Sequence, residues 1–127
     1  MRLRRLTNFV NILKVGYQNR KKQLKIKNVH LNMLLLRFFY KRGFIYHWKF
    51  IDNDIIVYLR YINNKPLFTK IKIVSSGGSR FFVPKRKNIK FYKDNIDIIL
   101  FTPKGLLGIQ EAENLGIGGE VFFIIYY

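Results

Sequence analysis

Cysteine is absent from this chain, and histidine and acidic residues are scarce. The absence of cysteine excludes a disulfide framework and a thiolate metal site, and the two histidines cannot form a zinc site alone. The 7 acidic residues are opposed by 24 lysines and arginines, and no acid precedes Asp52. Asp52 and Asp54 belong to a tight turn without a nucleophile or base beside them, so we interpret them as turn residues and not as catalytic carboxylates. We therefore expect neither an enzyme nor a cofactor.

The formal net charge of +17 is extreme for a chain of 127 residues. Self-repulsion of this size favours a polyanionic partner, and nucleic acid is the leading candidate. An anionic membrane surface, contacted by the basic N-terminal segment, stays open as an alternative. With 49% hydrophobic and 17% aromatic residues the chain is not a disordered basic tail, so we expect a packed core.

The composition also points to a compartment. Alanine occurs once, at Ala112, whereas isoleucine, phenylalanine, tyrosine, asparagine and lysine, which have A/T-rich codons, are abundant. This bias favours an organellar genome, and we expect a mitochondrion, with another organelle or a bacterium with an A/T-rich genome as the alternative. Residues 1–6 are basic and amphipathic, as in a transit peptide, but they continue into an expected helix, so we expect nothing to be cleaved. The sequence contains no uncharged apolar run of about 18 residues, so we do not expect a membrane-spanning helix.

The first half of the chain begins with a predicted helix, strand and helix. Apolar residues at helical spacing predict a helix over residues 5–16 that stops at Gly16. Strict alternation predicts a strand over residues 24–27 with a basic outer face. Asn28 fits the N-cap of a second amphipathic helix, in which His30 is a surface residue of the first turn.

The other predicted elements are mostly strands. In the first half, strands joined by turns form a meander over residues 44–46, 55–62 and 67–74. Serine and glycine at residues 75–79 then mark a domain boundary or a hairpin. Beyond them the pattern predicts strands over 81–83 and 96–101, another beginning at Leu106, a helix over 110–115 and a terminal strand. We therefore expect an α+β fold of two small domains, residues 1–74 with a helix-strand-helix-strand meander and residues 75–127 with mostly strands and one short helix.

Two basic runs are candidates for contact with phosphate groups. The first run contains Arg20, Lys21, Lys22 and Lys25, and the second contains Lys85, Arg86 and Lys87. Such runs are usually no more than solvated faces. No acid balances the first run, however, and unbalanced exposed cations are what binding to a nucleic-acid backbone uses, so we interpret these residues as phosphate contacts. Phe81 and Phe82 lie near the second run, where they either stack on bases or pack in a core.

Residues 100–127 are rich in glycine and poor in cations. A nucleotide-phosphate loop is excluded, because Glu120 and an apolar strand follow the glycines where such a loop needs Lys-Ser/Thr and a helix. Ordinary turn chemistry is one interpretation, with Gly116 closing a short helix and Gly118-Gly119 leading into a strand. The alternative is that the bare backbone lies against another molecule at close range.

The motif Thr102-x-Lys104-Gly105, followed by a short helical stretch, Gly116-x-Gly118-Gly119-Glu120 and a terminal strand, closely resembles the end of the universal eighth protein family of the small ribosomal subunit. The resemblance extends through Ser75-x-x-Gly78-x-Arg80 and, more loosely, to the first helix. It implies a two-domain α+β protein that binds a helix in the central domain of small-subunit rRNA and supports subunit assembly and translation. Its implied partners are this rRNA and neighbouring small-subunit proteins, with no membrane and no small-molecule substrate; another basic RNA-binding assembly factor is the alternative.

The resemblance also implies which positions contact rRNA, namely Phe101, Thr102, Pro103, Lys104, Gly105, Gly118, Gly119 and Glu120. We also expect Arg80 to contact rRNA. Many members carry hydroxyls on both sides of the threonine, where this chain has Phe101 and Pro103, so two possible contacts are lost. In the first helix, Ile12 and Val15 occupy positions where the family tends to have arginine and asparagine. This departure favours protein contact by the helix, or RNA contact moved to the basic run that follows it. We expect a side chain at Gly118 or Gly119 to weaken specific rRNA binding, and the Glu120 carboxylate to accept a hydrogen bond from a backbone donor or a ribose.

Overall fold

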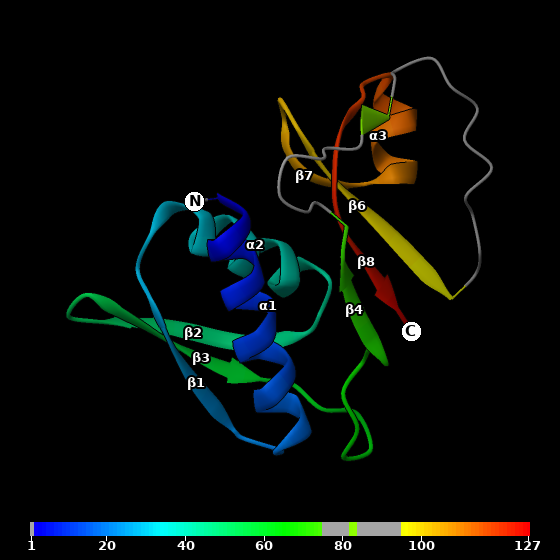
Figure 1. Cartoon of the computed structure of the whole chain (residues 1–127). Coiled ribbons are helices and arrows are strands. Elements are labelled where there is room, and N and C mark those ends of the chain that lie inside the picture. Colours follow the sequence, from blue (N-terminus) through cyan, green and yellow to red (C-terminus); the bar gives the residue numbers. More distant parts are fainter. Residues whose placement is uncertain (1, 75–81, 84–94) are drawn as a thin grey trace. The chain divides into compact units, whose positions relative to one another are not determined.

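The computed structural model describes residues 2–74, 82–83 and 95–127, and the chain forms two compact units, Met1–Leu67 and Phe68–Tyr127 (Figure 1). Helices and antiparallel sheets occur together, which confirms the expected α+β class. In the part of the chain that the structure describes, no helix has the length and apolar character needed to cross a membrane.

The first unit contains two helices and a three-stranded antiparallel sheet. Its elements are α1 (Arg2–Gln18), β1 (Gln23–Lys27), α2 (His30–Lys41), β2 (Ile45–Ile51) and β3 (Asp54–Leu59). The strand order is β1-β3-β2. Burial alternates along β1 and β3, so one face of this sheet is covered and the other is open to solvent. The contacts of α1 with α2 and β1, and of α2 with β2, place both helices on the covered face.

Aromatic side chains form much of the core of the first unit. Phe39 of α2 is fully buried, and its ring centroid lies 5.8 Å from that of Phe9 in α1 and 5.4 Å from that of Phe44. Tyr17 at the end of α1 is also buried, and its hydroxyl donates a hydrogen bond to the Phe44 carbonyl. Burial raises the pKa of Tyr17, so this hydroxyl keeps its proton and remains a donor. The core thus ties the end of α1 to the connection between α2 and β2.

Two of the expected helix boundaries are corrected by the structure. α1 continues through Gly16 to Gln18 because Gly16 serves packing and not helix termination: a Cβ there would lie 2.6 Å from Cδ2 of Leu24 in β1. The N-cap of α2 is Val29 and not Asn28, and no side chain caps this helix. His30 begins the helix and is exposed, as expected.

In its described residues, the second unit is an antiparallel β structure with one helix. Its elements are β4 (Lys70–Ile73), β5 (Phe82–Val83), β6 (Ile96–Thr102), β7 (Gly105–Gly108), α3 (Ile109–Leu115) and β8 (Gly119–Tyr126). The strand order is β4-β8-β6-β7, and β5 also pairs with β8. The third strand of the expected meander, β4, therefore belongs to this sheet and not to that of the first unit. For the same reason the two units divide between Leu67 and Phe68, ahead of the boundary suggested by the serine and glycine segment.

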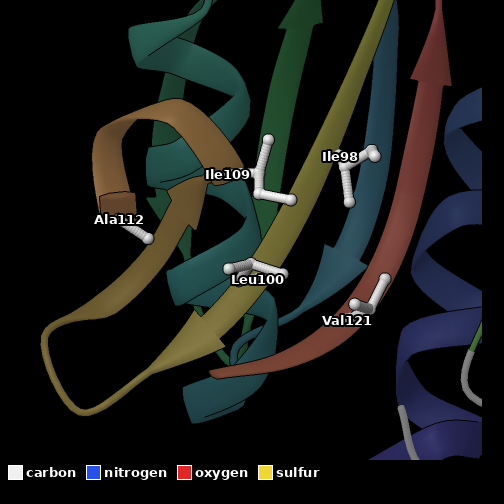
Figure 2. Close-up of a cluster of buried hydrophobic side chains, with 5 residues drawn as sticks. All are labelled: Ile98, Leu100, Ile109, Ala112 and Val121. Atoms are coloured by element: carbon white, nitrogen blue, oxygen red, sulfur yellow. The ribbon is translucent and has the colours of Figure 1, made fainter. Parts of the chain in front are cut away.

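A small apolar cluster fixes α3 against the sheet of the second unit. Figure 2 shows Ile98 and Leu100 of β6, Val121 of β8, and Ile109 and Ala112 of α3 converging between helix and strands. The only alanine of the chain is 1% exposed, because its methyl group faces the strands where a larger side chain would push the helix away. This packing joins α3 to β6 and to the start of β8.

Candidate nucleic-acid interface

The turn between β6 and β7 is organised by one buried hydroxyl. Thr102 pairs with Gly105 across the hairpin and is only 4% exposed. Its Oγ1 accepts a hydrogen bond from the Lys104 N–H at 3.1 Å and donates one to the Gly105 carbonyl at 2.8 Å. Pro103 and Lys104 are left exposed at the tip. The threonine thus shapes the turn from inside, and the turn presents a proline ring, a cation and backbone to the solvent.

Gly105 is required by the backbone of this turn. Its φ of +100° lies in a region that L side chains rarely adopt, although a Cβ there would meet no atom within 4 Å. Proline is favoured early in such a turn because its fixed φ suits the first turn position. Pro103 and Gly105 therefore specify the conformation that the Thr102 hydroxyl closes.

The start of β8 lies directly against the end of β6, which brings the two glycine-containing motifs together. Glu120 pairs with Phe101 in the sheet. A Cβ at Gly119 would lie 2.5 Å from the Phe101 carbonyl oxygen and 2.9 Å from Cγ2 of Thr102. Residues 102–105 and 118–120, separated in sequence by α3, thus lie next to one another in the fold. Gly119 owes its identity to this contact within the protein, so a side chain there disturbs folding before it meets any RNA.

Glu120 and Gly116 also have structural roles. The Glu120 side chain is 6% exposed and lies on a strand that is paired on both sides, with Phe101 and with Phe82. Its carboxylate therefore belongs to the interior of the second unit. Gly116 has a left-handed φ of +69° at the C-terminus of α3, which confirms that it closes the predicted helix. At the other end of α3, the Glu111 carboxylate accepts a hydrogen bond from the Gly108 N–H at 3.0 Å.

The first basic run forms the connection between α1 and β1. Arg20, Lys21 and Lys22 are all exposed there. Arg20 has a positive φ of 53°, and its Nη1 donates a hydrogen bond to the Asn64 carbonyl. The Tyr61 hydroxyl donates to the Lys21 carbonyl at 2.7 Å. The connection is thus fixed in position by the chain that follows β3, while the two lysine side chains extend into solvent.

Among the remaining cations expected at the interface, the structure describes Lys25. Lys25 lies on the open face of β1, and its Nζ is 3.3 Å from a carboxylate oxygen of Asp54. Both groups remain substantially exposed, so this surface ion pair leaves Lys25 accessible to a phosphate. The remaining cations, Arg80, Lys85, Arg86 and Lys87, lie outside the described residues.

One exposed surface was not anticipated from the sequence. β2 extends to Ile51, whereas the pattern predicted a strand only over residues 44–46. The added residues bring His47 and Lys49 next to Tyr58 of β3. The pairing register identifies His47 and Lys49, because it shows that both residues face the same side of the sheet as Tyr58. Among the described residues, no three histidine or acidic side chains gather closely enough to hold a metal ion.

Comparison with known proteins finds similarity to one family. Residues 5–126 match the model of the family described as ribosomal protein S8. The chain is 37% identical to the small ribosomal subunit protein uS8m of Acanthamoeba castellanii, over 94% of this chain and 97% of that protein. It is 34% identical to the small ribosomal subunit protein uS8 of Geobacter sulfurreducens, over 84% and 85% of the two chains, and 34% identical to uS8 of Petrotoga mobilis over the same shares.

Proposed function

The chain belongs to the ribosomal protein S8 family, and on this premise we propose that it binds a helix in the central domain of small-subunit rRNA through the β6–β7 turn and the start of β8. It is a structural protein of the small ribosomal subunit and not an enzyme. Binding of this rRNA helix supports assembly of the subunit, and neighbouring small-subunit proteins complete its partners. The mitochondrial location expected from the composition is confirmed by the uS8m relative.

The observation that carries the proposal is the closed turn at Thr102. The groove of an A-form helix that proteins read is wide and shallow, and it is recognised by its shape, its 2′-hydroxyls and its phosphates. A surface that fits this groove has to be rigid and to allow close backbone approach. The turn meets both requirements, since its hydroxyl bonds are internal and Gly105 has no side chain. Lys104 supplies the positive charge that a phosphate attracts.

This mode of binding assigns the polar residues different tasks from those that sequence resemblance alone suggests. Thr102 and Glu120 are buried, so they hold the surface in shape. Lys104 and the backbone on either side of it make the contact. The substituted positions Phe101 and Pro103 then matter less, because recognition depends on the form of the turn more than on the number of hydroxyls around it.

Replacement of Thr102 tests the proposal. Thr102→Val keeps the volume of the side chain but removes the hydroxyl, so the Lys104 N–H loses its acceptor and the turn loosens. We expect the affinity for a central-domain fragment of the mitochondrial small-subunit rRNA to fall about tenfold, corresponding to about 1.4 kcal/mol. Binding to a scrambled RNA of the same length should change little. The matched control is Thr102→Ser, which retains the hydroxyl and should bind both RNAs like the wild type.

The measurement is a pair of binding isotherms for each variant, taken after thermal melts have shown that the second unit is folded. Equal affinities of Thr102→Val and Thr102→Ser for the central-domain fragment would contradict the proposal. An equal loss of affinity for both RNAs would also contradict it, because the turn would then contribute only non-specific attraction.

A further inference from the structure

The three-stranded sheet of the first unit has an open face whose composition is unlike that of its covered face. Leu24 and Ile26 of β1 and Ile55 and Val57 of β3 are buried, and they lie on the side of the helices. Because successive side chains of a strand point to opposite faces, the residues between them lie on the other side. The pairing register then defines the open face by three rows of residues: Gln23, Tyr58 and His47; Lys25, Ile56 and Lys49; Lys27, Asp54 and Ile51.

A cluster of rings occupies one end of this face. The His47 and Tyr58 rings are stacked, with centroids 5.8 Å apart and planes inclined by 21°. Nζ of Lys49 lies 5.8 Å from the centroid of the Tyr58 ring. His47 and Lys49 are exposed and Tyr58 is half-buried. The stacked pair therefore offers a flat π surface to solvent, with a cation beside it.

The charge of the face is complementary to a polyanion. Lysines stand at Lys25, Lys27 and Lys49, and Asp54 is the one acid in the three rows. A carboxylate oxygen of Asp54 lies 3.3 Å from Nζ of Lys25, and this single acid leaves an excess of positive charge over the three rows. An acidic protein surface would match this charge, but it would make no use of an exposed stacked ring pair. A nucleic-acid strand uses both features.

We propose that this open face binds an unpaired RNA segment, with bases stacking on the His47–Tyr58 pair and phosphates contacting Lys27 and Lys49. In an A-form helix the bases are stacked within the duplex and their faces are inaccessible, so a stacking surface selects unpaired RNA. The site lies in the first unit and shares no residue with the β6–β7 turn. This site is tested with an unstructured RNA probe, whereas the proposed function is tested with a central-domain rRNA fragment. Failure of one proposal can therefore be distinguished from failure of the other.

The experiment uses the full chain and an oligouridylate of about 12 nucleotides, which covers a typical single-strand site. We expect His47→Ala to lower the affinity about tenfold, since stacking on an aromatic side chain makes a large contribution for each base. His47→Phe keeps a flat ring and should bind like the wild type. The matched control is Tyr46→Ala, which removes an exposed ring, 73% accessible, at the register irregularity of the same strand and outside the three rows.

Polyphosphate serves as a probe that has charges but no bases. Lys49→Ala should weaken the binding of both oligouridylate and polyphosphate, whereas His47→Ala should weaken only the binding of oligouridylate. An equal effect of His47→Ala on the two probes, or an effect of Tyr46→Ala as large as that of His47→Ala, would overturn the proposal. Cross-linking of the wild-type protein to oligouridylate containing 4-thiouridine gives a test that needs no variant: the adduct should fall within residues 47–58, and adducts confined to other segments would refute the site.

Discussion

At Gly119 the backbone of β8 passes so close to the end of β6 that a methyl group has no room. The ideal Cβ position lies 2.5 Å from the Phe101 carbonyl oxygen, and backbone atoms cannot move aside as a flexible side chain can. At Gly116 the situation is reversed, since a Cβ would meet open space but the φ of +69° disfavours most L residues. The two glycines of one motif are therefore needed for different reasons, one for space and one for backbone conformation.

This difference predicts different responses to substitution. Gly119→Ala should lower the free energy of unfolding by about 2 kcal/mol, because overpacking at a rigid contact commonly costs about 1–3 kcal/mol. Gly116→Asn serves as the matched control and should cost at most a few tenths of this amount, since asparagine adopts the left-handed conformation readily. Urea unfolding followed by circular dichroism measures both. A Gly119→Ala protein as stable as the wild type would show that β8 is not held against Phe101.

Single residues were predicted well where one local rule applied. Gly116 closes a helix and His30 lies exposed in a first turn, as local patterns indicated. The local pattern predicts a helix end at Gly16 because glycine often has that role, but in the structure Gly16 packs against Leu24 in the next strand. The burial of Thr102 likewise depends on a hairpin whose closure sequence spacing does not reveal. The space available to a side chain depends on its tertiary neighbours, and the local sequence does not specify which residues these are.

At the scale of elements, the connection between α1 and β1 combines a structural cation with two that are free for binding. Arg20 contacts the Asn64 carbonyl, whereas the Lys21 and Lys22 side chains are exposed. The Tyr61 hydroxyl holds the Lys21 carbonyl, which fixes the backbone without using the lysine side chain. The basic run is therefore a positioned pair of lysines, with Arg20 as part of the support.

Neutralising the two kinds of cation should separate stability from binding. The double variant Lys21→Ala/Lys22→Ala should unfold at the wild-type temperature and bind cognate and scrambled RNA more weakly to the same degree, since phosphate contacts do not specify sequence. Its plot of log affinity against log salt should be shallower by about 1.5, because each phosphate contact contributes about 0.7–0.9 to the slope. Arg20→Ala should instead lower the free energy of unfolding by about 1 kcal/mol. Loss of discrimination between the two RNAs in the double variant would contradict this division of tasks.

Helices and most strands could be predicted from periodicity, but partners of the strands could not. In β2 the register shifts between Ile45 and His47, which breaks the alternation and hides the second half of the strand from a pattern search. β4 alternates as expected, yet alternation cannot indicate which sheet a strand joins, and β4 pairs with β8 at the far end of the chain. The RNA site proposed on the open face of the first unit's sheet depends on the register of β2, so periodicity alone does not reveal it.

At the scale of the whole molecule, composition and shape determine different parts of the function. The net charge of +17 already indicates a polyanionic partner, and it requires no knowledge of the fold. In the proposed binding mode, the place of specific contact depends on Thr102, Gly105 and Gly119, which shape an uncharged part of the β6–β7 turn and the start of β8. Overall attraction and specific fit are thus supplied by different residues. The resemblance of the C-terminal motifs suggests the residues of specific fit, and the structure shows that the two motifs are adjacent.

The most direct test of this account uses the absence of cysteine from the chain. A single Lys104→Cys substitution gives one attachment point for a tethered iron chelate that cleaves nearby RNA backbone. We predict cleavage clustered in one helix of the central domain of mitochondrial small-subunit rRNA. Lys65→Cys, at an exposed lysine in another tight turn, is the matched control and should give a different pattern. Cleavage from position 104 that is scattered over the rRNA or identical to that from position 65 would contradict the claim that the β6–β7 turn is the specific contact.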